Sequence, residues 1–389
     1  MPPGLGIGPS VTCSLANTKT LPQLDGAWQR ERTLPHLQEA ITVFVEGDAL
    51  YDSMRADIAC ASHDIRLECY IVADDEIGGP ILDDLTQAAR NARRVKVRID
   101  AVGSWRLIAP PRLQAMISAG VHWHWSRPWS WRRPWQLHVR NHRKLLVLDD
   151  QVAYVGGFNL DRRSSRRIVG QSRWRDTHLR LTGPGVSESI TLFDAYPSAP
   201  RGPMPTVRSP LAILSNRSRH CRHRLHCAFA DAFEKARERI WLTTPYFVPD
   251  RRSQRGLCEA ARRGVDVRLL VPGKSDVPLA QWAARAAYTH MLAAGVRLWE
   301  YQPRVLHAKT ALVDQGWATV GTANFDYRSF FLNDEINLLG HAPTLNATLA
   351  QQFAEDLTQS REVLLTSWRR RSWYSPLLEL IGWAARRWL

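Results

Sequence analysis

The sequence lacks long apolar runs and organised cysteines. No stretch of the 389 residues approaches the roughly 18 uninterrupted apolar residues of a membrane-spanning helix, and the N-terminus lacks the basic start and apolar run of a secretory signal peptide. The six cysteines are scattered, without a CxxC pair or a dense disulfide framework. These absences favour a reducing compartment and a chain that is either soluble or held on a membrane surface.

Acidic residues are also in short supply. Lys plus Arg number 52 against 37 Asp plus Glu, so the protein is expected to attract polyanions: nucleic acid, an acidic membrane surface or a phosphorylated substrate. Charge alone does not choose among these partners. A content of 44% hydrophobic and 23% charged residues over this length is typical of a globular protein with two domains.

One motif of the form HxKxxxxD occurs twice, as His142, Lys144 and Asp149 and again as His307, Lys309 and Asp314. A glycine and then an asparagine follow each copy, ending at Asn159 in the first and Asn324 in the second. Every equivalent pair of positions is separated by 165 residues. A constant separation over five positions indicates a duplicated unit.

Each copy lies in the same local pattern of strands, turns and helices. The expected strands are 145–148, 152–155, 310–313 and 318–320, preceded in each half by strands at 95–100 and 265–271 and helices at 81–92 and 254–263. This alternation predicts a duplicated α/β fold. The expected divisions are a loose N-terminal arm (1–38), a first half (39–182), a Pro- and Gly-rich linker (183–224), a second half (225–370) and an amphipathic C-terminal helix (371–389).

The repeated motif suits phosphodiester chemistry. In a strand, residues i and i+2 share a face, so each HxK places an imidazole beside an ammonium. If the halves pack about a pseudo-two-fold axis, the four side chains converge. A phosphodiester repels nucleophiles by its negative charge, so its cleavage needs cations at the phosphoryl oxygens as well as a nucleophile and an acid.

We therefore expect one histidine to attack phosphorus and the other to protonate the leaving alcohol and later deprotonate the acceptor. Lys144, Lys309, Asn159 and Asn324 would hold the phosphoryl oxygens, so the site needs no metal or other cofactor. A single HxK is more often a surface pair, but two copies in register favour catalysis. Asp149 and Asp314 complete the candidate catalytic set, although a carboxylate at a strand end more often closes a turn.

On these motifs the chain resembles the phospholipase D superfamily over about residues 40–370. Arg304 to Asp314 and Arg328 to Asn337 are most similar to short-form bacterial cardiolipin synthases. The resemblance implies two α-β-α sandwich halves around one active site.

The resemblance also assigns roles. It makes His142 the nucleophile and His307 the acid and base, with Glu335 and Asp176 orienting the two histidines. Asp176 follows its motif asparagine by 17 residues, whereas Glu335 follows by 11. Thr322 supplies the family's phosphate-binding hydroxyl, and the first copy departs from the pattern with Gly157.

The reaction implied by the resemblance is phosphatidyl transfer between two phosphatidylglycerol molecules, giving cardiolipin and glycerol. Hydrolysis by the same site, as in a phospholipase or nuclease, is the alternative reaction. A binding module for anionic lipid or nucleic acid is a further alternative, but such a module would usually have lost a motif His or Lys. Neither the acceptor alcohol nor the oligomeric state follows from the sequence.

Two segments indicate a membrane surface rather than nucleic acid. Residues 123–135 interleave five tryptophans with arginines, a combination that favours the lipid headgroup boundary but also suits stacking on single-stranded nucleic acid. Near the C-terminus, apolar residues recur at helical spacing beside arginines, at Leu377, Ile381, Ala384, Ala385 and Trp388. That helix either binds an anionic leaflet or packs on the body. The expected location is peripheral, on the cytoplasmic side of a bacterial membrane.

A histidine- and cysteine-rich stretch lies in the expected linker, at His220, Cys221, His223, His226 and Cys227. It lacks the paired spacing of a zinc site. We expect it to be a basic linker segment and not a metal centre.

Overall fold

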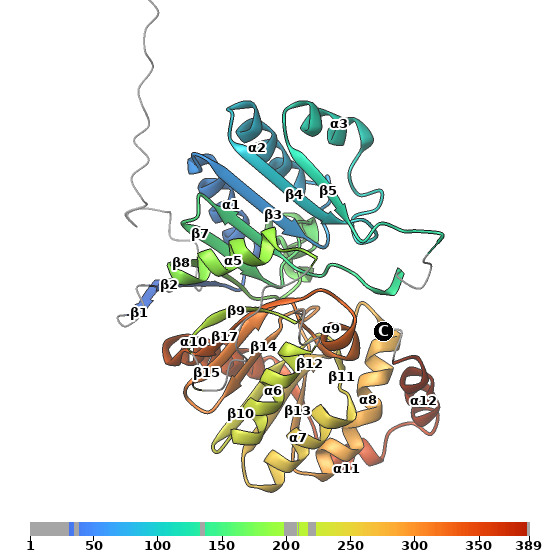
Figure 1. The fold of residues 1–389 in the computed structure, drawn as a ribbon. Helices are drawn as coiled ribbons and strands as arrows, with labels where there is room; N and C mark the ends of the chain where they lie inside the picture. The colour runs from blue at the N-terminus through green and yellow to red at the C-terminus, as the bar shows by residue number, and fades with distance from the viewer. Residues whose placement is uncertain are drawn as a thin grey trace, which may run out of the picture.

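Two stacked sheets form the framework of the protein. A computed structural model describes residues 31–34, 39–132, 137–197, 208, 210–216 and 223–386. These residues form two mixed eight-stranded sheets with helices on their faces, and one short two-stranded sheet (Figure 1). The predicted duplicated α/β fold is confirmed.

The first sheet runs in the order β1 (Glu31–Leu34), β2 (Glu39–Phe44), β8 (His178–Thr182), β7 (Val152–Gly156), β6 (Leu145–Leu148), β3 (Asp64–Cys69), β4 (Arg94–Asp100) and β5 (His122–Ser126). Its helices are α1 (Gly47–Cys60), α2 (Gly78–Arg90), α3 (Pro110–Ser118), α4 (Arg166–Val169) and α5 (Pro184–Asp194), with 3-10 turns at Arg162–Ser164 and Gly170–Ser172. Strands β3, β4 and β5 are parallel to one another, and β6 and β7 return antiparallel.

The second sheet runs in the order β18 (Ser360–Val363), β13 (Arg297–Tyr301), β12 (Asp266–Pro272), β10 (Arg239–Thr243), β14 (Thr310–Val313), β15 (Trp317–Gly321), β17 (Ile336–His341) and β9 (Ala212–Ser215). Its helices are α6 (Arg224–Lys235), α7 (Arg251–Arg262), α8 (Pro278–Ala293), α9 (Tyr327–Phe331), α10 (Pro343–Thr358), α11 (Leu365–Arg369) and α12 (Ser375–Ala385). The two-stranded sheet pairs β11 (Phe247–Val248) with β16 (Phe325–Asp326).

Three apolar layers hold these elements together. The outer face of the first sheet packs on α1 and α2, and the outer face of the second packs on α6, α7 and α8. Between the sheets, inward side chains of both halves join α5 and α10 in one core, represented by Val147, Val186, Leu338 and Leu345. Because this shared core joins the halves, both copies of the motif are held on a single rigid framework.

Two of the expected divisions need correction. Residues 31–34, assigned to a loose arm, form β1 and pair with β2, while residues 1–30 lie outside the described part of the chain. The expected linker also contributes an element to each half, since α5 packs in the shared core and β9 pairs with β17. A high proline and glycine content indicated a connection, but α5 and β9 are too short to stand out from it in the sequence.

The C-terminal helix α12 packs against α8 at Gly382, where a Cβ atom would lie 2.4 Å from the backbone nitrogen of Ala283. Leu377 and Leu380 on α12 are each 58% exposed. The expected helix therefore forms, and it packs on the body through a small residue while large apolar side chains face outward. Among the described helices, none has the length and apolarity required to cross a bilayer.

Candidate active site

The two motif histidines lie where the halves meet. His142 precedes β6, and its backbone N–H donates to the carbonyl of Asp334 in the second half over 2.9 Å. His307 precedes β14, and its backbone N–H donates to the carbonyl of Arg175 in the first half over 2.6 Å. Each histidine is thus fixed by a short parallel bridge to the opposite half.

Each histidine side chain is also paired with a carboxylate of the opposite half. His142 Nδ1 lies 3.1 and 3.0 Å from the two carboxylate oxygens of Glu335. His307 Nδ1 lies 2.5 Å from Asp176 Oδ2. A carboxylate at Nδ1 holds a proton there and directs Nε2, unprotonated, away from it. The two pairs cross between the halves, so neither half contains a complete site.

Asp176 and Glu335 follow their motif asparagines at different distances along the chain because the intervening segments fold differently. Between Asn324 and Glu335 the chain forms β16 and the short helix α9. Between Asn159 and Asp176 it forms α4 and two 3-10 turns. The longer segment after Asn159 places Asp176 beside His307, just as the shorter segment after Asn324 places Glu335 beside His142.

Both lysines are buried beside their histidines. Lys144 Nζ donates to the carbonyl of His142 over 2.9 Å. Lys309 Nζ donates to the carbonyl of His307 and lies 2.7 Å from His307 Nδ1. Lys144 and Lys309 are 1% and 3% exposed, so both ammonium groups lie inside the protein.

Burial and mutual repulsion set the protonation of the site. Burial, with a smaller contribution from the Lys309 ammonium, lowers the pKa of Lys144 to about 8, while Glu335 and Asp176 act against the shift. Burial also lowers the pKa of His142 to about 4, against the opposing effect of Glu335. His142 is therefore neutral near pH 7, which is the state that a nucleophile requires. The influence of Lys309 on both groups shows that the two motifs converge.

The carboxylates remain ionised although they are buried. Burial acts to raise the pKa of Asp176, but Lys309 and His307 outweigh it and hold the pKa below its usual value. Burial likewise opposes ionisation of Glu335, whose pKa is held down mainly by His142. Two ammonium groups and two carboxylates thus leave the empty site close to electroneutral.

Both motif asparagines are buried. Each follows the second strand of its motif in the chain, β7 before Asn159 and β15 before Asn324. Asn159 accepts from the backbone N–H of Ile71 over 3.3 Å through Oδ1, which leaves its amide N–H groups for another acceptor. The side-chain oxygen of Asn324 is buried and has no hydrogen-bond partner among the described residues. Both amides therefore retain unused hydrogen-bonding capacity, and their assignment to phosphate stays a prediction.

The hydroxyl of Thr322 contacts a carboxylate of the site, and its assignment to phosphate stays a prediction. Its hydroxyl donates to Glu335 Oε2 over 2.5 Å and accepts from the backbone N–H of Ile336 over 2.9 Å. It therefore steadies the carboxylate that orients His142. In the first half, a Cβ atom on Gly157 would lie 1.9 Å from Asp176 Oδ1. The glycine in the first motif therefore makes room for that carboxylate.

The two motif aspartates contact backbone N–H groups at the starts of β3 and β10. Asp149 accepts from the backbone N–H groups of Ser62, His63 and Asp64 at the start of β3. Asp314 accepts from those of Arg237, Glu238 and Arg239 at the start of β10. At about 3.3 Å per residue of extended chain, these carboxylates lie at the far end of the sheet from the histidines. These contacts favour the turn-closing alternative, and a catalytic role for the two aspartates stays a prediction.

Three aromatic rings adjoin the histidines and were not assigned from the sequence. The Tyr70 ring lies 5.0 Å from that of His142, and the Trp174 ring lies 5.0 Å from that of His307. Tyr246 lies 6.4 Å from His307, and its hydroxyl donates to Asp276. Tyr70 and Tyr246 each follow the central strand of their half, β3 and β10, and this shared position was the available signal.

The histidine- and cysteine-rich stretch is partly described. His226 Nε2 lies 2.9 Å from Asp250 Oδ2, and its ring packs on Phe330 and Phe331. His220 and Cys221 lie outside the described residues. Within the part of the chain that the structure describes, no three His, Cys, Asp or Glu side chains are grouped to hold a metal ion.

Comparison with protein families agrees with the duplicated site. The family described as cardiolipin synthase, PLD-like domain, matches residues 54–170 and 229–357, one segment in each half. The cardiolipin synthase of Halalkalibacterium halodurans is 34% identical over 353 residues, which cover 87% of this chain and 70% of the relative. That of Geobacillus kaustophilus is 32% identical over 367 residues, covering 89% and 72%.

Solved structures share the fold at low sequence identity. Phosphatidylserine synthase of Haemophilus influenzae superimposes with a TM-score of 0.69 at 15% identity, covering 89% of this chain and 92% of that chain. Polyphosphate kinase of Porphyromonas gingivalis gives 0.60 at 16% identity, covering 85% and 49%. These likenesses establish the two-sheet architecture.

The contacts of Asp149 predict that its replacement affects stability and not chemistry. Asp149→Ala removes acceptors from three backbone N–H groups, which costs about 1–3 kcal/mol of unfolding free energy. Asp149→Asn retains an acceptor and tolerates the positive φ of 49° at this position, so it should recover most of the loss. Denaturant unfolding measures the first effect. Activity per folded molecule should stay within a few-fold of wild type in both variants, and a loss in both as large as that of His142→Ala would contradict the framework role.

Proposed function

This chain belongs to the phospholipase D superfamily, in the family of cardiolipin synthases with a PLD-like domain, and we propose that it transfers a phosphatidyl group from one phosphatidylglycerol to another through a phosphohistidine. The observation that carries the proposal is the crossed pairing of His142 with Glu335 and of His307 with Asp176. This pairing leaves the Nε2 atom of each histidine available for reaction. The buried ammonium groups of Lys144 and Lys309 lie beside the two histidines.

In the first step, Nε2 of neutral His142 attacks phosphorus as the bond to the headgroup glycerol breaks, and His307 gives its Nε2 proton to the departing oxygen. Glu335 stabilises the positive charge that develops on the imidazole of His142. Lys144, Lys309 and the two motif asparagines neutralise the phosphoryl oxygens.

In the second step, the headgroup hydroxyl of another phosphatidylglycerol attacks the phosphohistidine. His307 takes the hydroxyl proton, the P–N bond breaks, and cardiolipin leaves with His142 neutral again. Water in place of this hydroxyl would give phosphatidic acid, which is the hydrolase alternative.

The charge of the site supports the acid role of His307. Burial and the Lys309 ammonium lower the pKa of His307 in the empty site, while Asp176 opposes the shift. A bound phosphodiester brings one negative charge beside this group and raises its pKa. Substrate binding therefore favours the protonated His307 that the first step requires.

The reaction is tested by incubating the protein in EDTA with phosphatidylglycerol vesicles and identifying lipid products by mass spectrometry. Cardiolipin should form without metal, and His142→Ala and His307→Ala should each lower the rate by roughly 10³-fold or more. His290→Ala, on the exposed end of α8, is the control and should keep wild-type activity. Phosphatidic acid as the sole product would identify a hydrolase, and cardiolipin at an undiminished rate in either active-site variant would refute the mechanism.

We further propose that the protein attaches peripherally to the cytoplasmic leaflet of a bacterial membrane. All thirteen large apolar side chains that are exposed in the described chain fall in two stretches, 105–137 and 364–383. They include Trp131 at 71% and Trp373 at 88% exposure. The segment after β5 and the helix α12 both project on the right-hand side of Figure 1.

Basic groups accompany these exposed rings, as a negatively charged leaflet requires. Arg132 lies over the Trp131 ring at 5.2 Å and Arg386 over the Trp383 ring at 3.7 Å. Tryptophan with a neighbouring cation suits the headgroup boundary, where the ring is half buried and the cation meets phosphate. The free thiols of the four described cysteines fit a reducing compartment.

Flotation with vesicles tests the attachment. Leu377→Gln with Leu380→Gln should lower binding to phosphatidylglycerol vesicles by about 30-fold or more, because each exposed leucine contributes roughly 1–2 kcal/mol when buried in lipid. Trp129→Ser with Trp131→Ser should act similarly. Neutral phosphatidylcholine vesicles are the charge control, and Arg255→Gln on α7 is the control variant. Unchanged flotation of both double variants would contradict the proposal.

A further inference from the structure

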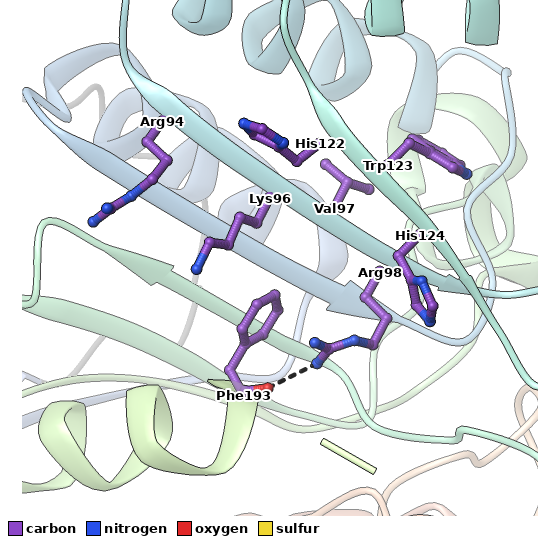
Figure 2. Close-up of a pocket in the computed structure, with 8 residues that line it drawn as sticks. All are labelled: Arg94, Lys96, Val97, Arg98, His122, Trp123, His124 and Phe193. Atoms are coloured by element: carbon purple, nitrogen blue, oxygen red, sulfur yellow. Dashed lines mark hydrogen bonds between the residues drawn. The ribbon is translucent and has the colours of Figure 1, made fainter. Parts of the chain in front are cut away.

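A second cationic cavity lies in the first half, away from the HxK residues. It has a volume of about 540 Å³ and is bounded by β4, β5 and the end of α5 (Figure 2). Its charged and titratable lining consists of Arg94, Lys96, Arg98, His122 and His124. The carboxylates of Asp64, Asp194 and Glu68 pair with the three strong bases at its margin. The chemistry proposed for His142 and His307 uses none of these groups.

The strand period explains why these groups share one face. Positions 94, 96 and 98 alternate along β4, and positions 122 and 124 alternate along β5. The parallel register places Lys96 beside His122 and Arg98 beside His124. The intervening β4 residues Val95 and Val97 point into the outer core. The alternation of side chains along β4 and β5 therefore places these basic residues on one face of the sheet.

The duplicated half shows what ordinarily covers this face. By strand register, Leu270 and Trp299 of the second half correspond to Arg98 and His124. Leu270 and Trp299 are buried in an apolar cluster with Phe353 of α10. β18 also covers the outer edge of β13, whereas β5 is the last strand of its sheet in the described chain.

The helix on this face is shorter in the first half. α5 has 11 residues and ends at Asp194, whereas α10 has 16 and carries Phe353 over the sheet. At the positions of Arg98 and His124 the second half has a closed apolar core, whereas the first half has an open cavity. At the positions of Lys96 and His122 both halves are basic, with Arg268 and Arg297 in the second half.

The three strong bases of the cavity already have partners at its margin. Arg98 donates to the carbonyl of Phe193 over 3.0 Å and lies 3.5 Å from the buried carboxylate of Glu68, and Arg94 donates to Asp64. Lys96 lies 3.3 Å from the partly exposed Asp194, a pair that solvent weakens. The Lys96 ammonium can therefore turn to a second anion beside the exposed imidazoles of His122 and His124.

We propose that this cavity binds a phosphate group, carried either by an anionic lipid headgroup or by a soluble phosphate ester. Arginine, lysine and histidine together supply the charge-assisted donors that phosphate oxygens accept. The volume fits a headgroup and its phosphate. Strand β5, which carries His122 and His124, is followed in the chain by the segment with the exposed rings of Trp129 and Trp131.

The test compares three forms of the full chain. The first is wild type and the second carries Lys96→Gln, His122→Gln and His124→Gln. The third is a matched control with Arg90→Gln, His63→Gln and His290→Gln, which removes one strong base and two imidazoles from exposed positions elsewhere. All three are prepared in a His142→Ala background, so that turnover cannot consume the ligand.

Binding is measured by calorimetry with glycerol phosphate and by sedimentation with phosphatidylglycerol vesicles. The cavity variant should bind one or both probes at least tenfold more weakly than wild type, and the control variant should stay within twofold. A loss confined to the soluble probe identifies a phosphate ester as the ligand, and a loss confined to vesicles identifies a lipid headgroup.

Equal binding of both probes by the cavity and control variants would overturn the inference. Binding of a single-stranded oligonucleotide that the cavity substitutions abolish, with neither phosphate probe affected, would also overturn it. Because the probes report binding and not turnover, either result is independent of whether the chain makes cardiolipin.

Discussion

The crossed pairing of histidines and carboxylates is the constraint on which the rest of the structure depends. Glu335 must reach His142 and Asp176 must reach His307 across the boundary between halves. Both pairs are buried, so they require a rigid surround that excludes water. The shared apolar core and the backbone bridges at Asn141 and Leu306 supply that surround. The duplicated fold therefore yields one site and not two.

Departures from symmetry are informative because the two halves share their framework. Gly157 stands where the second half has Thr322, since Asp176 occupies the space of its side chain. The shorter α5 ends at Phe193 and Asp194 beside an open cavity on β4 and β5, whereas α10 carries Phe353 over the equivalent strands. Gly157 thus keeps the two carboxylates equivalent, and the shorter α5 leaves a cavity in the first half.

The sequence predicted the parts of this structure that depend on local pattern. Constant spacing between the motifs and apolar strand runs were sufficient for the duplicated α/β fold, and they singled out both HxK pairs. Tertiary contacts decided the remainder: Thr322 turns to Glu335, and Asp149 closes a turn beside β3. The sequence of a motif does not show which groups a hydroxyl will contact. Nor does it show that a carboxylate will lie at the opposite end of the sheet from the histidines. The short elements α5 and β9 were hidden in a proline-rich connection for the same reason.

The most direct test of the crossed site is rapid-quench detection of phosphohistidine with phosphatidyl-p-nitrophenol, whose leaving group needs no acid. Asp176→Asn removes the carboxylate that orients His307 and that lies 3.5 Å from Lys309, while the pairing of His142 with Glu335 remains. The intermediate should therefore form at His142 and accumulate because its breakdown lacks a base. Glu335→Gln should slow its formation by about 10²–10⁴-fold. Accumulation in Glu335→Gln instead would reverse the two roles, and indistinguishable behaviour of the two variants would contradict the crossed pairing itself.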